Sequence, residues 1–276
     1  LTGNVKKSNA IITTKTNHGL NIGDLIDLAV FPGITTNVVV QYNDANRRMI
    51  VNPKSFTLFD VDVNNDTISI LNHGYKTGDK VIHISSSSTG GLSNDVIYYI
   101  IVIDNNTIRL SNEYYGYLNE SVIFSYIDLT TPSFGVLWSI NPSIKVYRNN
   151  TVTFDLSDLS LSSSGMSAFT FDLYTDKQFK NKFYTSDFDN FSVKKVGEIG
   201  IDLNASVKLT INSATPENLY YKLTPIIKGG IAQSKQDIIN DDENIDNNNT
   251  LIVSGSLYNN SYSVVGIAST TIKLCL

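Results

Sequence analysis

The sequence has 276 residues and a formal net charge of −5, and its basic clusters, such as Lys6-Lys7, Arg47-Arg48 and Lys194-Lys195, are only pairs. This argues against a nucleic-acid partner, because such partners require a clustered basic face. The chain has a single cysteine, Cys275, so it cannot form an intramolecular disulfide. It also contains no run of 18 or more apolar residues, the length that a membrane-spanning helix requires. Charged residues make up only 17% of the chain, so its abundant Ser, Thr, Asn, Ile, Val and Tyr predict strands and polar turns rather than helices.

The first expected unit covers residues 1–54 and contains the motif NHGLNIGD at residues 17–24. Apolar runs at residues 10–14 and 25–30 flank the motif, a pattern that predicts a strand, two turns and a second strand. The motif glycines supply turn positions with positive φ, and its aspartate can accept hydrogen bonds from turn amides. Residues 37–51 then predict a hairpin.

The motif returns as NHGYKTGD at residues 72–79, with 55 positions between His18 and His73. A repeat of this kind predicts two copies of one small β unit rather than one large catalytic core. Residues 96–110 predict two further strands around an Asp-Asn-Asn turn. The second unit is expected to cover residues 55–140.

A change of pattern after the Asn141-Pro142 break predicts a third unit over residues 141–228. Apolar and polar residues alternate through Val152, Phe154 and Leu156, and again through Val207, Leu209 and Ile211. This period of two puts one face of each strand inward. A two-sheet sandwich is the natural package for such strands.

The fourth expected unit, residues 229–276, combines an acidic linker at 240–249 with a hairpin signal at 250–267. It stops within an expected strand, so we expect the chain to be a piece of a longer polypeptide. The nearest helical candidate, residues 233–245, lacks a sustained 3.6-residue period and leaves room for at most one short helix. The predicted fold class is all-β, with tandem small β-roll or barrel repeats, an immunoglobulin-like β-sandwich module and the start of a further β unit.

Candidate chemistry in the sequence is sparse. A Gly-x-Ser-x-Gly nucleophile elbow and a cysteine with histidine support are both missing from the sequence. His18 and His73 occupy equivalent turn positions, and His83 lies in an expected strand, where a solvent-facing or hydrogen-bonded histidine is predicted. We therefore predict no catalytic residues, no metal ligands and no cofactor.

Three acidic clusters offer alternatives to that prediction. Asp60, Asp62, Asn64 and Asp66 alternate as in a calcium loop but lack its glycine, and the linker at residues 240–249 could hold calcium at a junction between β units. Sugar hydrolysis would require paired carboxylates, for which the candidates are Asp155, Asp158, Asp172 and Asp176. Solvated turns and linkers are the favoured interpretation of all three clusters.

Tyrosines form the remaining candidate surface, because tyrosine combines a large apolar ring with a polar tip that suits sugar binding or a subunit interface. Core and rim packing is the favoured alternative, and Trp138 is predicted to anchor a domain core. The tyrosines concerned are Tyr98, Tyr99, Tyr114, Tyr115, Tyr117, Tyr126, Tyr147, Tyr220 and Tyr221.

The paired turn motifs are followed by NNTVTFDLSD (149–158), FTFDLYTDKQF (169–179), VGEIG (196–200) and LYYKLTP (219–225). In this order they resemble the large virion structural proteins of marine tailed phages, above all those of myophages that infect cyanobacteria. The resemblance covers most of the chain. It implies a fibrous or multidomain component of the tail, baseplate, neck or fibre, and it carries over no enzymatic residues.

The expected function is therefore that of a non-enzymatic structural component of a phage virion, assembled in the host cytoplasm. Small β modules with exposed edges suit docking to neighbours, so we expect a homo-oligomer, a trimer or ring, with other virion proteins as partners. Two alternatives stay open: a glycan-binding adhesin that uses Tyr114, Tyr115 and Tyr117 on a host surface, and a fragment of a polysaccharide depolymerase. No nucleic acid and no membrane insertion are expected.

Overall fold

The computed structural model describes residues 10–13, 19–27, 34–86, 90–113, 125–183, 193–212, 215–228, 231–232, 250–254, 261–268 and 271–275. Apart from two 3-10 turns, η1 (Leu58–Asp60) and η2 (Leu159–Leu161), every regular element in these ranges is a strand. The predicted all-β class is confirmed. The expected short helix at 233–245 lies outside the described residues, and the described ones contain no helix that could cross a membrane.

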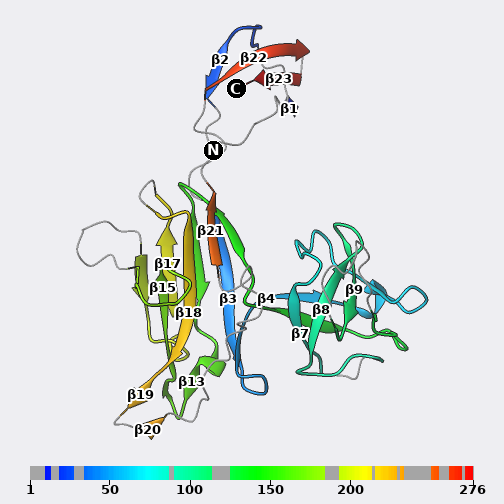
Figure 1. The fold of residues 1–276 in the computed structure, drawn as a ribbon, viewed down its shortest axis with the longest axis vertical. Coiled ribbons are helices and arrows are strands. Elements are labelled where there is room, and N and C mark those ends of the chain that lie inside the picture. The colour runs from blue at the N-terminus through cyan, green and yellow to red at the C-terminus, as the bar shows by residue number, and fades with distance from the viewer. Residues whose placement is uncertain are drawn as a thin grey trace.

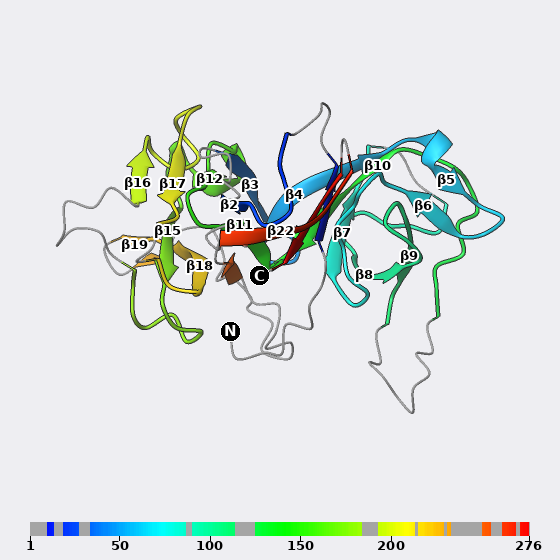
Figure 2. The ribbon, with the colours of Figure 1, turned by 90° about the horizontal axis from the view of Figure 1, so that it is seen from above.

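The described strands form three bodies, which Figure 1 shows well separated. The terminal sheet joins the two ends of the chain, in the order β1 (Ala10–Thr13), β23 (Thr271–Cys275), β22 (Ser261–Ala268) and β2 (Leu25–Asp27). The sandwich comprises described residues within 34–51 and 140–254, and the roll comprises those within 52–139. Figure 2 shows the sandwich and the roll side by side, with β4 and β10 between them.

The sandwich packs two sheets against one hydrophobic core. The first sheet contributes β16 (Val193–Val196), β17 (Ser206–Thr210), β12 (Thr151–Asp155) and β3 (Thr35–Asn43). The second contains β11 (Ile144–Tyr147), β21 (Thr250–Ser254), β18 (Asn218–Pro225) and β15 (Phe169–Tyr174). Two short ribbons adjoin them: β13 (Ser162–Ser163) with β14 (Met166–Ser167), and β19 (Ile227–Lys228) with β20 (Ile231–Ala232).

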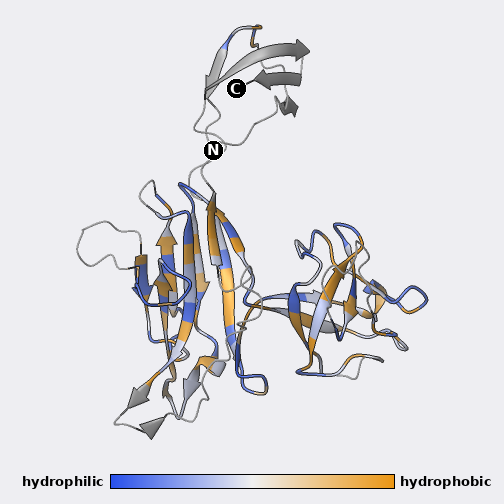
Figure 3. Ribbon diagram, viewed as in Figure 1, coloured by the Kyte–Doolittle hydropathy of each residue, from blue (hydrophilic) through white to orange (hydrophobic). Residues whose placement is uncertain are grey.

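Strand alternation builds the sandwich core as predicted. The apolar residues that alternate through 152–156 and 207–211 were expected to point inward. All of them are buried in the sandwich core. The ring of Phe154 lies 4.7 Å from that of Phe171 and 5.3 Å from that of Tyr221, so aromatic contacts join the two sheets. Figure 3 shows hydrophobic residues concentrated along these strands and hydrophilic ones in the loops.

The roll has its own core, formed by strands that continue the first sheet of the sandwich. Beyond β3 the sheet runs through β4 (Arg48–Phe56), β10 (Gly135–Ile140), β7 (Lys80–Ile84), β8 (Ile97–Val102), β9 (Thr107–Ser111), β6 (Thr67–Ser69) and β5 (Val61–Asp62). Ile68, Ile100 and Ile108 are fully buried in the core of the roll. The hairpins predicted at 37–51 and 96–110 are confirmed as the pairs β3–β4 and β8–β9.

A β-bulge in β4 joins the two cores. Val51 pairs with Ser139 and Lys54 pairs with Leu137, so Asn52 and the proline after it face a single residue of β10. Because an extra residue reverses the alternation, Val51 enters the sandwich core while Phe56, five residues later, enters the roll core on the same sheet face. The left-handed φ of 50° at Asn52 accommodates the bulge.

The opposite face of the sheet at this junction carries a third apolar cluster. Trp138 packs there with Ile50, Ile82 and Ile140, and only 7% of its surface is exposed. The sequence predicted Trp138 as the anchor of one domain core. It lies instead on the sheet face opposite both cores, where strands of the sandwich and of the roll meet.

Strand pairing divides the chain differently from the expected units 1–54, 55–140, 141–228 and 229–276. β3 pairs in parallel with β12, and its Val38 and Val40 lie in the sandwich core, so residues 34–51 belong with the expected third unit. The expected hairpin at 250–267 is not formed, because β21 pairs with β11 and β18 whereas β22 pairs with β2 and β23. The roll is thus inserted in the sandwich, and both are inserted in the terminal sheet.

The terminal sheet repeats four strands of the roll. The order β1-β23-β22-β2 matches β6-β9-β8-β7, and TIKLC of β23 matches TIRLS of β9. The register of β2 with β22 agrees with that of β7 with β8, because Leu25 opposes Ser263 as Lys80 opposes Tyr99. β22 and β23 therefore correspond to the hairpin β8–β9. They pair with the strands that flank the first motif, although they lie about 240 residues further along the chain.

Truncation of the junction tryptophan tests whether the shared sheet supports both bodies. Trp138→Ala should lower the free energy of unfolding by about 3–5 kcal/mol, because it removes a large buried side chain between strands of both bodies. Chemical denaturation followed by circular dichroism measures this loss. Phe59→Ala removes a ring that is 89% exposed and should change stability by less than about 0.5 kcal/mol. Equal effects of the two substitutions would contradict the assignment.

Candidate functional site

The candidate site is a cleft of about 310 Å³ between the roll and the sandwich. Three segments line it: the bulged part of β4, the second copy of the repeated motif, and the chain that leads from β10 into β11. The lining residues are Asn52, Lys54, Asn72, His73, Gly74, Tyr75, Lys76, Asp79, Ser139, Pro142, Ser143, Ile144 and Lys145. We refer to this site as the junction cleft.

The wall of the junction cleft on the sandwich side is fixed from within the sandwich core. The hydroxyl of the fully buried Tyr221 donates a hydrogen bond of 2.6 Å to the carbonyl oxygen of Pro142. Burial raises the pKa of Tyr221, so its hydroxyl stays protonated and remains a donor. On the β4 side, the Asn52 side-chain oxygen accepts a 3.2 Å hydrogen bond from the amide of Val39.

The wall on the roll side is the motif turn, whose residues 74–79 fold in the same way as the described residues 19–24 of the first copy. Gly19 and Gly74 have φ values of 66° and 67°, and Gly23 and Gly78 have 98° and 95°. The motif aspartate accepts a hydrogen bond from the amide three residues earlier in each copy, at 2.7 Å for Asp24 and 2.8 Å for its counterpart in the roll. The motif is therefore a folding device, as its residue types predict.

His73 holds this turn against the β8–β9 connection. Its Nδ1 accepts a 3.0 Å hydrogen bond from the amide of Tyr75, and its Nε2 lies 2.7 Å from the carbonyl oxygen of Asp104. Because Nδ1 accepts, the ring is neutral with its proton on Nε2, which donates to that carbonyl. Both ring nitrogens are engaged, so His73 serves the turn as predicted. His18 lies outside the described residues.

Charge in the junction cleft is predominantly positive. Lys54, Lys76 and Lys145 line it together with a single carboxylate, that of Asp79. Burial lowers the pKa of Lys54, and burial raises the pKa of Asp79 against the opposing hydrogen bond from the Lys76 amide. Among the described residues, no carboxylate forms an ion pair with any of the three lysines.

Tyr75 contributes an apolar ring and a polar hydroxyl to the junction cleft. The Nζ of Lys54 lies 5.4 Å from the centre of its ring, within cation–π range. Its hydroxyl is buried and has no hydrogen-bond partner of normal geometry in the described ranges. Burial raises the pKa of Tyr75 and keeps the hydroxyl protonated. A buried hydroxyl without a partner costs about 1–3 kcal/mol, which a suitable acceptor would offset.

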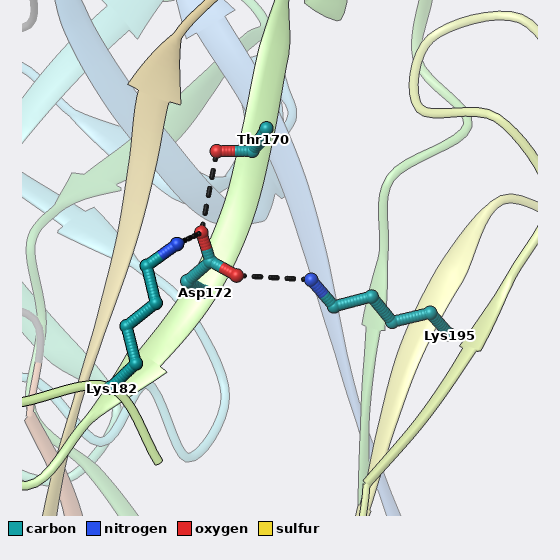
Figure 4. Close-up of polar contacts among 4 residues, drawn as sticks. All are labelled: Thr170, Asp172, Lys182 and Lys195. Carbon is teal, nitrogen blue, oxygen red and sulfur yellow. Dashed lines mark hydrogen bonds and ion pairs between the residues drawn. The ribbon is translucent and has the colours of Figure 1, made fainter. Parts of the chain in front are cut away.

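A second cluster of charges lies on the sandwich, where Asp172 of β15 faces two lysines (Figure 4). Its oxygens lie 2.9 Å from Nζ of Lys182 and 3.0 Å from Nζ of Lys195. Burial by itself raises the pKa of Asp172, but the two lysine contacts outweigh it and leave the pKa below its usual value. The cluster ties β15 to β16, the edge strands of the two sheets, and an adjoining cavity measures only about 170 Å³.

The carboxylates suggested for sugar hydrolysis do not converge, because each is committed to its own neighbours. Asp155 accepts hydrogen bonds from the amide and hydroxyl of Ser157, and Asp158 accepts from the Gln41 side chain and caps η2. Asp176 accepts three backbone amides of the following turn. The fourth member is the lysine-paired Asp172.

The carboxylates of the calcium-like pattern also stabilise turns. Asp60 accepts from the amide and hydroxyl of Thr57, and Asp62 accepts from the amides of the two residues that follow Val63. Asp66 accepts from the amide of Leu129. In the described ranges no three His, Cys, Asp or Glu side chains converge as metal ligands would. The linker at 240–249 lies outside the described residues.

His83 is buried in β7, with 1% of its surface exposed, and its Nδ1 lies 3.4 Å from the carbonyl oxygen of Ser93. The hydrogen-bonded alternative predicted for it is the one observed, whereas a solvent-facing ring is not. Burial lowers the pKa of His83, and the contact with Ser93 opposes this shift only partly. The neutral form is therefore favoured in the folded protein.

The tyrosines do not form one platform among the described residues. Tyr98, Tyr220 and Tyr221 are buried, whereas Tyr126 is 49% exposed and stacks with Arg109, whose guanidinium carbon lies 4.6 Å from its ring centre. Lysines cover the rings of Tyr99 and Tyr147. The three proposed for glycan binding, Tyr114, Tyr115 and Tyr117, lie outside the described residues.

Comparisons of the chain with protein-family models, with curated proteins and with solved structures find no match.

The junction cleft was not predicted from the sequence, because its three segments are far apart along the chain. The one signal that could have pointed to it is the difference between the motif copies, where Leu20 and Asn21 of the first become Tyr75 and Lys76 in the second.

Removal of the motif histidine tests its role in the turn. His73→Ala should lower the free energy of unfolding by about 2–4 kcal/mol, because the amide of Tyr75 and the carbonyl of Asp104 lose their buried partner. Thermal and denaturant unfolding measure the loss. Lys76→Asn is the matched control on the same turn and should cost less than about 0.5 kcal/mol, since the first copy has asparagine there. A neutral effect of His73→Ala would refute the role.

Acid titration tests the burial of His83. Because its folded pKa is lowered, its contribution to stability is complete above the unfolded pKa of about 6.5 and is lost as the pH falls through that value toward the folded pKa. The free energy of unfolding should therefore decline between pH 7 and pH 5. In His83→Gln the decline should be smaller, although the variant is less stable at pH 7. Parallel curves for the two proteins would show that His83 is not the group responsible.

Proposed function

We propose that the protein is a non-enzymatic structural component of a phage virion, built of β bodies that dock neighbouring subunits in the tail, baseplate, neck or fibre. The observation that carries the proposal is the eleven-stranded sheet that passes through both the sandwich core and the roll core. Backbone hydrogen bonds and a buried cluster connect the two bodies, which suits a stiff spacer better than a hinge that closes on a substrate.

The nesting of the bodies supports the same proposal. The chain crosses between the sandwich and the roll twice, at β4 and β10, and the terminal sheet needs both ends of the described chain. A body held by two crossings resists being pulled away from its neighbour more than one joined by a single linker. Load-bearing parts of a particle require this property.

Exposed apolar side chains supply candidate docking surfaces. Leu203, in the loop between β16 and β17, is 96% exposed, and Phe59, in η1 of the roll, is 89% exposed. Each is a candidate contact point for another subunit. The expected partners are further copies of the chain, in a trimer or ring, and other virion proteins. The ordered motifs that resemble virion proteins of marine phages favour a location in the particle.

Assembly provides the test of this function. Analytical ultracentrifugation of the full chain should show a closed oligomer, and mass spectrometry should find the protein in purified particles. Leu203→Ser should shift the oligomer toward the monomer by about tenfold in dissociation constant, because a central apolar contact contributes about 1–2 kcal/mol. Lys208→Ser, at an exposed position of the neighbouring strand, serves as the control. A strictly monomeric protein that is missing from particles would overturn the proposal.

Glycan binding is the second candidate, and the exposed ring of Tyr126 favours it. The ring stacks with Arg109, so a flat apolar surface and a cation lie together on the roll. Aromatic faces of this kind bind the apolar faces of sugars.

A further inference from the structure

The junction cleft contains features that the fold itself does not require. Both motif copies adopt the same turn, so Tyr75 and Lys76 are not needed to form it, since leucine and asparagine serve at these positions in the first copy. In the second copy the same two positions line the cleft. Two of the three positions at which the copies differ therefore line the cleft.

The electrostatics of the cleft point to an anion. On a chain with a net charge of −5, three lysines line the cleft, and in the described ranges none of them forms an ion pair. Lys182 and Lys195, in contrast, both pair with Asp172. Because the cleft walls partly exclude water, the attraction of these cations for an anion exceeds that at an open surface.

The size and polarity of the cleft narrow the class of anion. Its volume of about 310 Å³ is at the lower end of the volumes of small-molecule sites and far exceeds the volume of an inorganic ion. Asn52, Asn72 and Ser143 line it with groups that exchange hydrogen bonds with hydroxyls, and Asp79 adds an acceptor that would repel a compact dianion. The buried hydroxyl of Tyr75 lies near the Ser139 side chain but forms no hydrogen bond of normal geometry within the described chain.

We propose that the junction cleft binds a sugar unit that carries a carboxylate. Lys54, Lys76 and Lys145 attract the carboxylate, whereas the side-chain amides of the cleft and Asp79 form hydrogen bonds with the sugar hydroxyls. The buried ring of Tyr75, which stacks on the His73 ring and lies under Lys54, forms part of the cleft wall and holds that lysine in place. This function is additional to the structural role, and a failure to bind sugar would leave the assembly test unaffected.

Titration of the full chain with D-glucuronate, followed by isothermal calorimetry and by ligand-observed NMR, tests the site. Saturable binding of glucuronate is expected, with D-glucose at least about tenfold weaker because it lacks the charge. Inorganic phosphate should also be at least about tenfold weaker, because it cannot fill the cleft. Failure of glucuronate to saturate, or equal binding of phosphate, would overturn the proposal, the latter by indicating a general anion site.

Two variants assign the binding to the cleft. Lys76→Asn and Tyr75→Leu restore the residues of the first copy, whose turn has the same geometry, so both should fold. Each should weaken glucuronate binding by about tenfold. Lys208→Met removes the same charge from an exposed strand position that is not part of the cleft lining and should change the affinity by less than about twofold. Equal effects of Lys76→Asn and Lys208→Met would refute the site.

Discussion

The structure depends on one irregularity in one strand pair, the bulge at Asn52 opposite Trp138 in β4 and β10. Without the extra residue, the alternation that places Val51 in the sandwich core would point Phe56 away from the roll core. The bulge keeps both cores on one face of a continuous sheet and leaves the other face to the tryptophan cluster. It also turns Lys54 toward the junction cleft, so the candidate site arises from the same feature as the connection between the bodies.

The two motif copies share a turn that folds locally, but among the described residues only the second copy lines the junction cleft. In both copies the histidine–glycine and glycine–aspartate steps are retained, and the turn geometry is the same in the residues described. In the second copy, Tyr75 and Lys76 line the junction cleft. No described residue of the first copy lines it. A turn whose stability comes from its backbone and capping groups leaves the remaining side chains available for binding.

The polar residues that attracted attention in the sequence are mostly structural in the regions described. Asp62, Asp155 and Asp176 each accept backbone amides within a few residues, an arrangement that short-range turn chemistry explains fully. The lysine-paired Asp172 connects the two sheets of the sandwich instead of facing a second carboxylate. Lysines that form no ion pair in the described ranges line the junction cleft instead, where no sequence pattern marked them.

The sequence by itself determined the all-β class, the strand faces through Val152 and Phe154, the hairpins β3–β4 and β8–β9, and the motif turns, because periodicity, turn residues and capping act within a few residues. Only the tertiary structure decided that β3 joins β12, that β22 and β23 return to pair with the strands of the first motif copy, and that Lys54, Lys76 and Lys145 line one cleft. Strand partners far apart in the chain are chosen by the burial of whole faces against one another, and no local pattern encodes that choice.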